Sequence, residues 1–297
     1  MERDARTPRK NASASVWELI TRKTLAADEL LKDPLWKKHR RFASLPDGQL
    51  QVICLTGKRS GDGLFPPDCI GDGILRRFAL NSPLELALRL SIGARYQWAS
   101  DQWNGNCNHD ELWRPILQAI AARDFTAAGH LADMAKLDHR SPAPILTGVI
   151  SLLRKDPRLL QSAAVPVSKK DPAYVRAIKS VLKAVADGSV ADFANGMNEM
   201  LSAYRRYMFG DELYGLIDPH ALGLYELCRR FDPLVVADFD IGRKLPWNQE
   251  YYEWSQQIAD ISDHFNVTDV PETIGRFLFR FETIPWGKQV LANWHSA

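Results

Sequence analysis

The sequence contains few cysteines and no long apolar run. Its four cysteines, Cys54, Cys69, Cys107 and Cys228, are widely separated, and none belongs to a Cys-x-x-Cys pair, the usual half of a zinc site. A chain of 297 residues buries enough apolar surface to fold without disulfides, so we expect four reduced thiols. No segment approaches the roughly 20 consecutive apolar residues of a membrane span, and no apolar signal core follows the charged residues 1–10. We therefore expect a cytoplasmic protein with no membrane partner.

Recognised catalytic motifs are absent as well. The chain has no Gly-x-Ser-x-Gly nucleophile turn and no His-Glu-x-x-His zinc motif, and its seven histidines occur singly. In the glycine cluster at residues 56–63, Gly57-Lys58 is followed by more glycine and then by two prolines, which is not the order of a phosphate-binding loop. These absences predict a protein that is not an enzyme and that binds no nucleotide or other cofactor.

Three short groupings could contribute metal ligands, but none forms a site by itself. Residues 107–111 hold a cysteine, a histidine and two carboxylates on one loop, where such close ligands cannot surround a tetrahedral ion. His130 and Asp133 share one predicted helix face. Glu250 and Glu253 share another, but the repeated Glu-x-x-His motif of di-iron bundles is missing. We interpret these side chains as solvated or capping residues and predict no metal.

Most of the chain has a helical pattern. Leu86, Leu90, Ala94 and Trp98 recur at helical spacing after Asn81-Ser82-Pro83, where a serine can cap a helix that begins with proline. The same start signal recurs at Asp218-Pro219, and a related one at Leu245-Pro246-Trp247. About ten helices are expected among eleven candidate segments, which are residues 16–31, 84–103, 111–122, 124–136, 142–154, 172–187, 190–209, 219–231, 247–264, 272–281 and 286–294.

The predicted fold class is therefore mainly α. We expect a multi-helix bundle or irregular stacked helical hairpins, with at most one or two short strands near residues 49–56. The predicted organisation is a flexible N-terminus at residues 1–15 and a single helical domain at 16–297. A division of that domain into subdomains 16–105 and 106–297 is the alternative.

Two segments of the helical part resemble each other. Residues 116–121, followed by Asp-Phe at 124–125, are echoed by residues 181–186, followed by Asp-Phe at 192–193. An apolar helix, a short turn with aspartate and a second apolar helix form the pattern of helical-hairpin repeats. No fixed period of about 34 residues extends along the chain, so the pattern predicts related hairpins without a regular repeat.

Charge is distributed unevenly along the chain. Residues 1–80 contain 15 Lys plus Arg against 10 Asp plus Glu, whereas residues 210–272 contain 4 against 13. A concentrated negative field attracts cationic surfaces and repels phosphate backbones. The acidic region therefore favours a basic protein partner and excludes nucleic acid; a solvated acidic helix face is the alternative.

The most distinctive stretch is 218–254. Aspartates alternate there with apolar residues, and tyrosines and tryptophans with glutamates follow, which is typical of a surface that anchors a basic protein. The alternative for Trp247 and Trp254, seven residues apart on a predicted helix, is a place in the core. The residues that we predict to bind a partner are Asp238, Asp240, Glu250, Tyr251 and Trp254.

On these residues the chain resembles the immunity protein 49 family of bacterial polymorphic-toxin systems. The features that carry the resemblance are an Ala-rich helix at 181–193, a Leu/Ala-rich helix after Asp218, the apolar segment 234–241 and Leu245-Pro246. The resemblance implies a non-enzymatic cytosolic protein that binds and neutralises a cognate toxin, and it carries over no catalytic residues.

The sequence thus favours an immunity protein for a basic, nuclease-like toxin. One alternative is a helical-repeat adaptor that binds a protein or peptide. Another is an enzyme whose catalytic residues meet only in the fold. The sequence makes no prediction of the oligomeric state.

Overall fold

The structure is a computed structural model that describes residues 82–104, 109–135, 143–163, 167–207, 217–237, 239–240, 247–265, 275 and 278–282. Within these ranges there are nine α-helices and no β-strand, so the predicted mainly α fold class is confirmed. The helices are α5 (Pro83–Asn104), α6 (Trp113–Ala121), α7 (Phe125–Met134), α8 (Pro144–Arg154), α9 (Pro157–Ala163), α10 (Ala173–Asp187), α11 (Val190–Tyr207), α12 (Pro219–Phe231) and α13 (Gln249–Gln256). The predicted arm at 1–15, strand near 49–56 and helices at 16–31 and 286–294 lie outside the described residues.

Two helices begin at the predicted capping signals. The Ser82 hydroxyl accepts a hydrogen bond from the Glu85 amide (3.3 Å), and Pro83 is the first residue of α5. The Asp218 carboxylate caps α12, which begins with Pro219. Proline suits this position because the first helical N–H has no partner within the helix, so nothing is lost by its absence.

The predicted helix at 247–264 is shorter in the structure. Helix α13 is capped by Asn248 and ends at Gln256. A separate 3-10 helix, η3 (Ile261–His264), follows it and is capped by the Asp260 carboxylate. The reason for the break is this second cap, because an aspartate that bonds the amide two residues later starts a new turn.

Three helical hairpins share one type of connection. In each, a residue with positive φ ends the first helix and the next residue caps the second helix. The pairs are Arg123-Asp124 between α6 and α7, Lys155-Asp156 between α8 and α9, and Gly188-Ser189 between α10 and α11. In every pair the amide of the capping residue donates to the carbonyl five residues before it, the bond of a Schellman motif. The connections are therefore geometrically equivalent.

These connections recur every 32 or 33 residues, from Arg123 to Lys155 and from Lys155 to Gly188. Comparison of residue types missed this spacing, since the left-handed position is occupied by Arg, Lys and Gly in turn. A non-glycine residue with positive φ costs about 1 kcal/mol, so hydrogen bonds and packing must hold the first two turns. The short helix α9 was not predicted, because seven residues are too few for a helical period to stand out.

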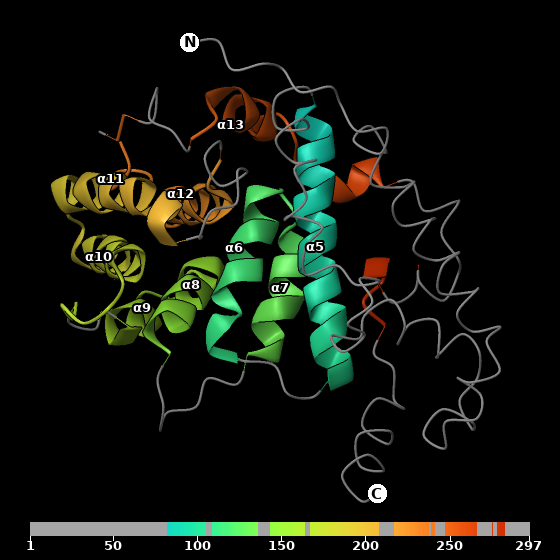
Figure 1. The fold of residues 1–297 in the computed structure, drawn as a ribbon, viewed down its shortest axis with the longest axis horizontal. Helices are drawn as coiled ribbons and strands as arrows, with labels where there is room; N and C mark the ends of the chain where they lie inside the picture. Colours follow the sequence, from blue (N-terminus) through green and yellow to red (C-terminus); the bar gives the residue numbers. More distant parts are fainter. Residues whose placement is uncertain are drawn as a thin grey trace, which may run out of the picture.

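The hairpins lie side by side, from α6 and α7 to α10 and α11 (Figure 1). Helix α5 packs against α6 and α7, and α12 contacts α6, α8 and α11. The predicted apolar positions of α5, Leu86, Leu90, Ala94 and Trp98, are all buried. They belong to one hydrophobic cluster that extends to Phe281.

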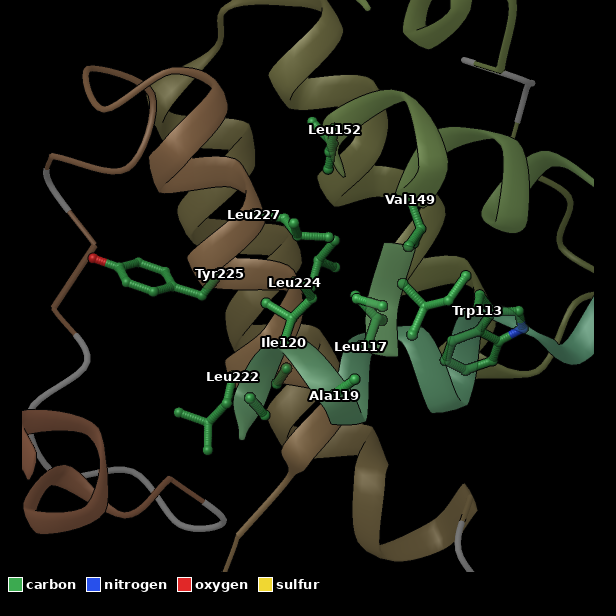
Figure 2. Packing of buried hydrophobic residues seen from close by; sticks show 14 of the residues in the cluster. Trp113, Leu117, Ala119, Ile120, Val149, Leu152, Leu222, Leu224, Tyr225 and Leu227 are labelled. Carbon is green, nitrogen blue, oxygen red and sulfur yellow. The ribbon is translucent and has the colours of Figure 1, made fainter. Parts of the chain in front are cut away.

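Helices α6 and α12 approach each other unusually closely. A Cβ atom added to Gly223 of α12 would lie 2.0 Å from the carbonyl oxygen of Leu117 in α6, so only glycine fits there. Figure 2 shows Leu224 of α12 beside Leu117 and Ile120 of α6, within the shared core. This contact fixes the position of α12, and with it the segment that follows.

Candidate protein-binding surface after helix α12

The segment at 232–240 is anchored to the core by three apolar side chains. Val235, Val236 and Phe239 are buried. The Phe239 ring lies 5.9 Å from the Phe193 ring of α11 and 5.8 Å from the Tyr225 ring of α12, between ring centroids. The segment is therefore held in one place on the hairpin stack.

The same segment presents Leu234 to solvent. This side chain is 76% exposed, and among the described residues only Val167 (38%) is another exposed large hydrophobic side chain. Local hydrogen bonds fix the backbone: the Leu234 amide donates to the Asp232 carboxylate (2.9 Å), and the Ala237 amide donates to the Leu234 carbonyl (3.2 Å). A single exposed apolar side chain is common on protein surfaces, so the ordered backbone around Leu234, together with the exposed acids nearby, is what makes it a candidate contact residue.

Four of the five predicted partner-binding residues can be placed. Asp240 and Glu250 are exposed, and Trp254 is half-buried with its ring 5.9 Å from the Tyr251 ring. Asp238 lies outside the described residues. Two of the predicted partner-binding residues, Asp240 and Glu250, are therefore accessible to a partner.

The prediction that Tyr251 lies on the binding surface is wrong. Its side chain is 1% exposed, and its hydroxyl donates a hydrogen bond to the Ala121 carbonyl at the end of α6 (2.9 Å). Burial raises the pKa of this phenol. Trp247 is also buried, 5.6 Å from the Tyr225 ring, so its core alternative is the correct one. Tyr251 in α13 and Trp247 just before that helix therefore both belong to the core.

Two carboxylates of the acidic region are not on the surface. Asp218 is fully buried and Glu226 is 3% exposed. A buried carboxylate adds little to the field outside the protein when it is neutral or paired. The negative surface charge after α11 is therefore smaller than the sequence suggests. The two buried acids lie in different surroundings.

Glu226 of α12 is surrounded by three arginines. Its Oε1 atom lies 2.5 Å from Nη1 of Arg123 and 2.8 Å from Nε of Arg230, and its Oε2 atom lies 2.9 Å from Nη2 of Arg229. Burial alone would raise the pKa of Glu226, but the three guanidinium groups outweigh burial and hold the pKa below its ordinary value. Glu226 is therefore ionised, and the cluster has more positive than negative charge.

Asp218 lies in a different environment. Its carboxylate accepts hydrogen bonds from the His220 and Ala221 amides (both 3.0 Å) and from the Tyr174 hydroxyl (2.9 Å). Burial nevertheless raises the pKa of Asp218 to about 7, against the effect of these bonds. Burial therefore favours the neutral form of this carboxyl far more than in an exposed aspartate.

His220 lies beside this carboxyl in a cage of aromatic rings. Its ring centroid is 5.4 Å from that of Trp113 and about equally far, at 6.5 and 6.4 Å, from those of Tyr174 and Tyr204. Burial, with a smaller effect of Arg114, lowers the pKa of His220 to about 3. Its Nδ1 atom has no hydrogen-bond partner among the described residues and lies 3.9 Å from an Asp218 oxygen.

These groups do not form an accessible catalytic site. Asp218 and His220 are 0% and 5% exposed, so a substrate could not reach them in this conformation. Cys228 is buried and its thiol pKa is raised, which opposes formation of a thiolate nucleophile. Among the residues that the structure describes, no three His, Cys, Asp or Glu side chains are grouped to hold a metal ion.

A second buried ion pair joins distant parts of the chain. Arg95 of α5 forms two bonds to the Asp124 carboxylate, Nε to Oδ2 (2.6 Å) and Nη2 to Oδ1 (2.9 Å). Its Nη1 atom donates to the Leu278 carbonyl (2.9 Å), and its guanidinium lies 4.6 Å from the ring centroids of Phe265 and Phe281. This pair supports the fold and lies away from the exposed segment.

Sequence reasoning missed two features of this region. Leu234 belongs to the apolar segment 234–241, and the proline before it and the aspartates on both sides are a local sign of exposure. Arg229 and Arg230 are two of the few positive charges in an acidic region. Their convergence with Arg123 on one carboxylate involves residues more than 100 positions apart, which no local pattern reports.

No helix in the described ranges combines the length and apolar character that a membrane span needs. Comparison of the chain with family models, with curated proteins and with solved structures gives no match.

Proposed function

We propose that the protein is a cytoplasmic immunity protein that binds and neutralises a cognate toxin without catalysing a reaction. The observation that carries the proposal is Leu234, which is 76% exposed on a segment anchored by Val235, Val236 and Phe239. Such preorganisation lowers the cost of binding, because the segment loses little freedom when a partner covers it. Leu234 is the proposed centre of the interface.

The charges near this segment favour a basic partner. Asp240 is exposed on the segment itself, and Glu250 and Glu253 are exposed on α13. Charged groups at the rim of an interface mainly increase the association rate and select the partner, whereas a central apolar side chain supplies affinity. A basic toxin with an apolar pocket for Leu234 fits both features.

The central test is Leu234→Asp. Tagged wild-type protein is used to capture the partner from the native host, and the captured toxin is then titrated against purified variants. We expect Leu234→Asp to weaken binding by about 30-fold or more, the effect of losing a hot spot, and to abolish protection of cells that express the toxin. Val167→Asp, at the other exposed large hydrophobic residue in the described part of the chain, is the matched control and should bind as wild type does.

Charge reversal tests the rim separately. Asp240→Lys with Glu250→Lys should slow association about tenfold at low salt and leave dissociation nearly unchanged. Glu199→Lys with Asp187→Lys, at exposed acids of α11 and α10, makes the same change in net charge and is the control. Toxin binding that is unchanged in Leu234→Asp would overturn the proposed interface. Capture of a metabolic enzyme complex in place of a toxin would overturn the immunity proposal itself.

A helical-repeat adaptor is the second candidate. The connections at 123–124, 155–156 and 188–189 follow one another at nearly equal spacing along the chain, as the connections of helical-repeat proteins that bind peptides do. The adaptor proposal places the peptide on the hairpins and not on the segment after α12, so the peptide would bind Leu234→Asp as well as wild type. The same titration therefore separates the two candidates.

A further inference from the structure

The arginines around Glu226 leave positive charge uncompensated. Arg123, Arg229 and Arg230 all contact this carboxylate, so three guanidinium groups share one negative charge. Burial lowers the pKa of Arg123; Glu226 opposes this effect, and the charges of Arg230 and Arg229 add to it. The arginines therefore repel one another, and a second anion would relieve that repulsion.

The three guanidinium groups are already held in position. Arg229 donates to the Gln256 side chain (2.7 Å), and Arg123 donates through Nε to the Ile258 carbonyl (3.0 Å). The Arg230 guanidinium lies 3.6 Å from the centroid of the Phe125 ring, in cation–π contact. A ligand that binds here would not have to order flexible side chains, which is the usual cost of binding to surface arginines.

Donors remain available on the solvent side. The side chains of Arg229 and Arg230 are 38% and 39% exposed, whereas that of Arg123 is 9% exposed behind them. Arg230 uses Nε for Glu226, and its two Nη groups have no hydrogen-bond partner among the described residues. Two N–H groups of one planar guanidinium match two oxygens of a carboxylate or phosphate.

We propose that Arg229 and Arg230, supported by Arg123, form a binding site for a small oxoanion with a phosphoryl or carboxylate group. The anion would lie on the exposed Nη groups, outside Glu226, and neutralise the excess charge. This site is separate from Leu234 and does not depend on the identity of a partner, so it can hold whether or not the proposed function does.

The test measures thermal stability in different anions at one ionic strength. Phosphate, pyrophosphate and citrate are compared with chloride, and Kd values are then obtained by calorimetry. We expect the oxoanions to raise the Tm of the wild-type protein and Arg230→Gln to weaken their binding at least tenfold. Arg154→Gln, at an exposed arginine whose one ion pair within the described ranges is with Asp133, should bind as wild type does. A response to phosphate and pyrophosphate but not citrate would assign phosphoryl groups; the reverse would assign carboxylates.

Glu226→Gln provides a second test, because it should strengthen anion binding whereas Arg230→Gln should weaken it. Removal of the central carboxylate leaves three arginines without a negative partner, so the variant should be less stable in chloride. Phosphate or citrate should then restore part of the lost stability and bind more tightly than to wild type. Equal stability in chloride and in all three oxoanions, for wild type and Glu226→Gln alike, would overturn the site. An equal response of Arg230→Gln and wild type would also overturn it.

Discussion

Helices α7 and α12 each begin at a buried capping aspartate, but different partners stabilise the two carboxylates. Each helix begins at an aspartate, Asp124 or Asp218, that is 0% exposed and accepts hydrogen bonds from backbone amides of its own helix. Asp124 is also paired with the guanidinium of Arg95 through two bonds. Asp218 receives a phenol hydrogen bond from Tyr174 instead, and its pKa is raised to about 7.

The difference shows that a capping aspartate does not determine its own charge. The local sequence specifies the cap, because only the next few amides are needed. The group that stabilises or fails to stabilise the negative charge comes from Arg95 or Tyr174, which are 29 and 44 residues away. The same substitution of aspartate by asparagine at the two caps should therefore change the free energy of unfolding by different amounts.

The largest effect is expected for Asp124→Asn. Asparagine keeps the cap but leaves the Arg95 guanidinium buried without its counter-ion, which typically costs about 3–5 kcal/mol. Chemical denaturation of wild type and variant measures the loss. Asp133→Asn, which breaks the exposed pair with Arg154, is the control and should cost less than about 1 kcal/mol. Similar losses for the two variants would mean that burial does not govern the Asp124 pair.

The second prediction concerns the pH dependence of stability near Asp218. Its folded pKa, about 7, lies above the ordinary value of 3.8, so its contribution to stability is complete below pH 3.8 and is lost as pH rises to 7. His220 has a folded pKa of about 3, below the ordinary 6.5, so its contribution is present above pH 6.5 and is lost as pH falls. Between pH 4 and 6.5, rising pH therefore reduces the contribution of Asp218 to stability and increases that of His220, so the two effects oppose each other.

Asp218→Asn should reveal the pH dependence of the free energy of unfolding that His220 causes. Without the carboxyl, the free energy of unfolding should rise with pH from 4 to 6.5, by at most about 1.4 kcal/mol per pH unit, relative to wild type. At pH 7 the variant should lie within about 1 kcal/mol of wild type, because asparagine is an equally good cap. Urea titrations across this pH range measure both quantities. Parallel profiles of variant and wild type would contradict the raised pKa of Asp218.

The smallest effect is expected for Tyr174→Phe. Loss of its hydroxyl removes one hydrogen bond to Asp218, worth about 1 kcal/mol, and more when the acceptor is charged. The cost should therefore grow between pH 5 and pH 8 as Asp218 ionises. Tyr251→Phe is the matched control, because its hydroxyl donates to the neutral Ala121 carbonyl and its cost should not change with pH. Equal pH profiles for the two variants would refute the comparison.

The helices themselves were largely predictable. Ser82-Pro83 and Asp218-Pro219 marked helix starts because caps and prolines act over four residues. The regular spacing of the hairpins was not predictable, since Arg123, Lys155 and Gly188 share a backbone conformation and no side-chain chemistry. What repeats is the backbone conformation of the connections, which a comparison of residue types cannot detect.

The candidate surface was predicted in part. Composition located it between Asp218 and Trp254, but the difference between Tyr251 and Leu234 depends on which side chain meets α6. Tyr251, an aromatic residue near glutamates, has the sequence pattern of a surface anchor but lies in the core, whereas Leu234, an aliphatic residue after a proline, is exposed. Burial is decided by tertiary packing, which composition does not contain.

The bond from Arg95 to the Leu278 carbonyl has a consequence for synthesis of the chain. The two residues are 183 positions apart, so a ribosome must add most of the protein after Arg95 before that bond can form. The hairpins from α6 to α11 need only near neighbours and can assemble earlier. A chain that stops before residue 278 would leave this guanidinium without its last carbonyl and without Phe281 beside it. This bond is therefore among the last of the described contacts that the growing chain can complete, whereas the Arg95–Asp124 pair can form earlier.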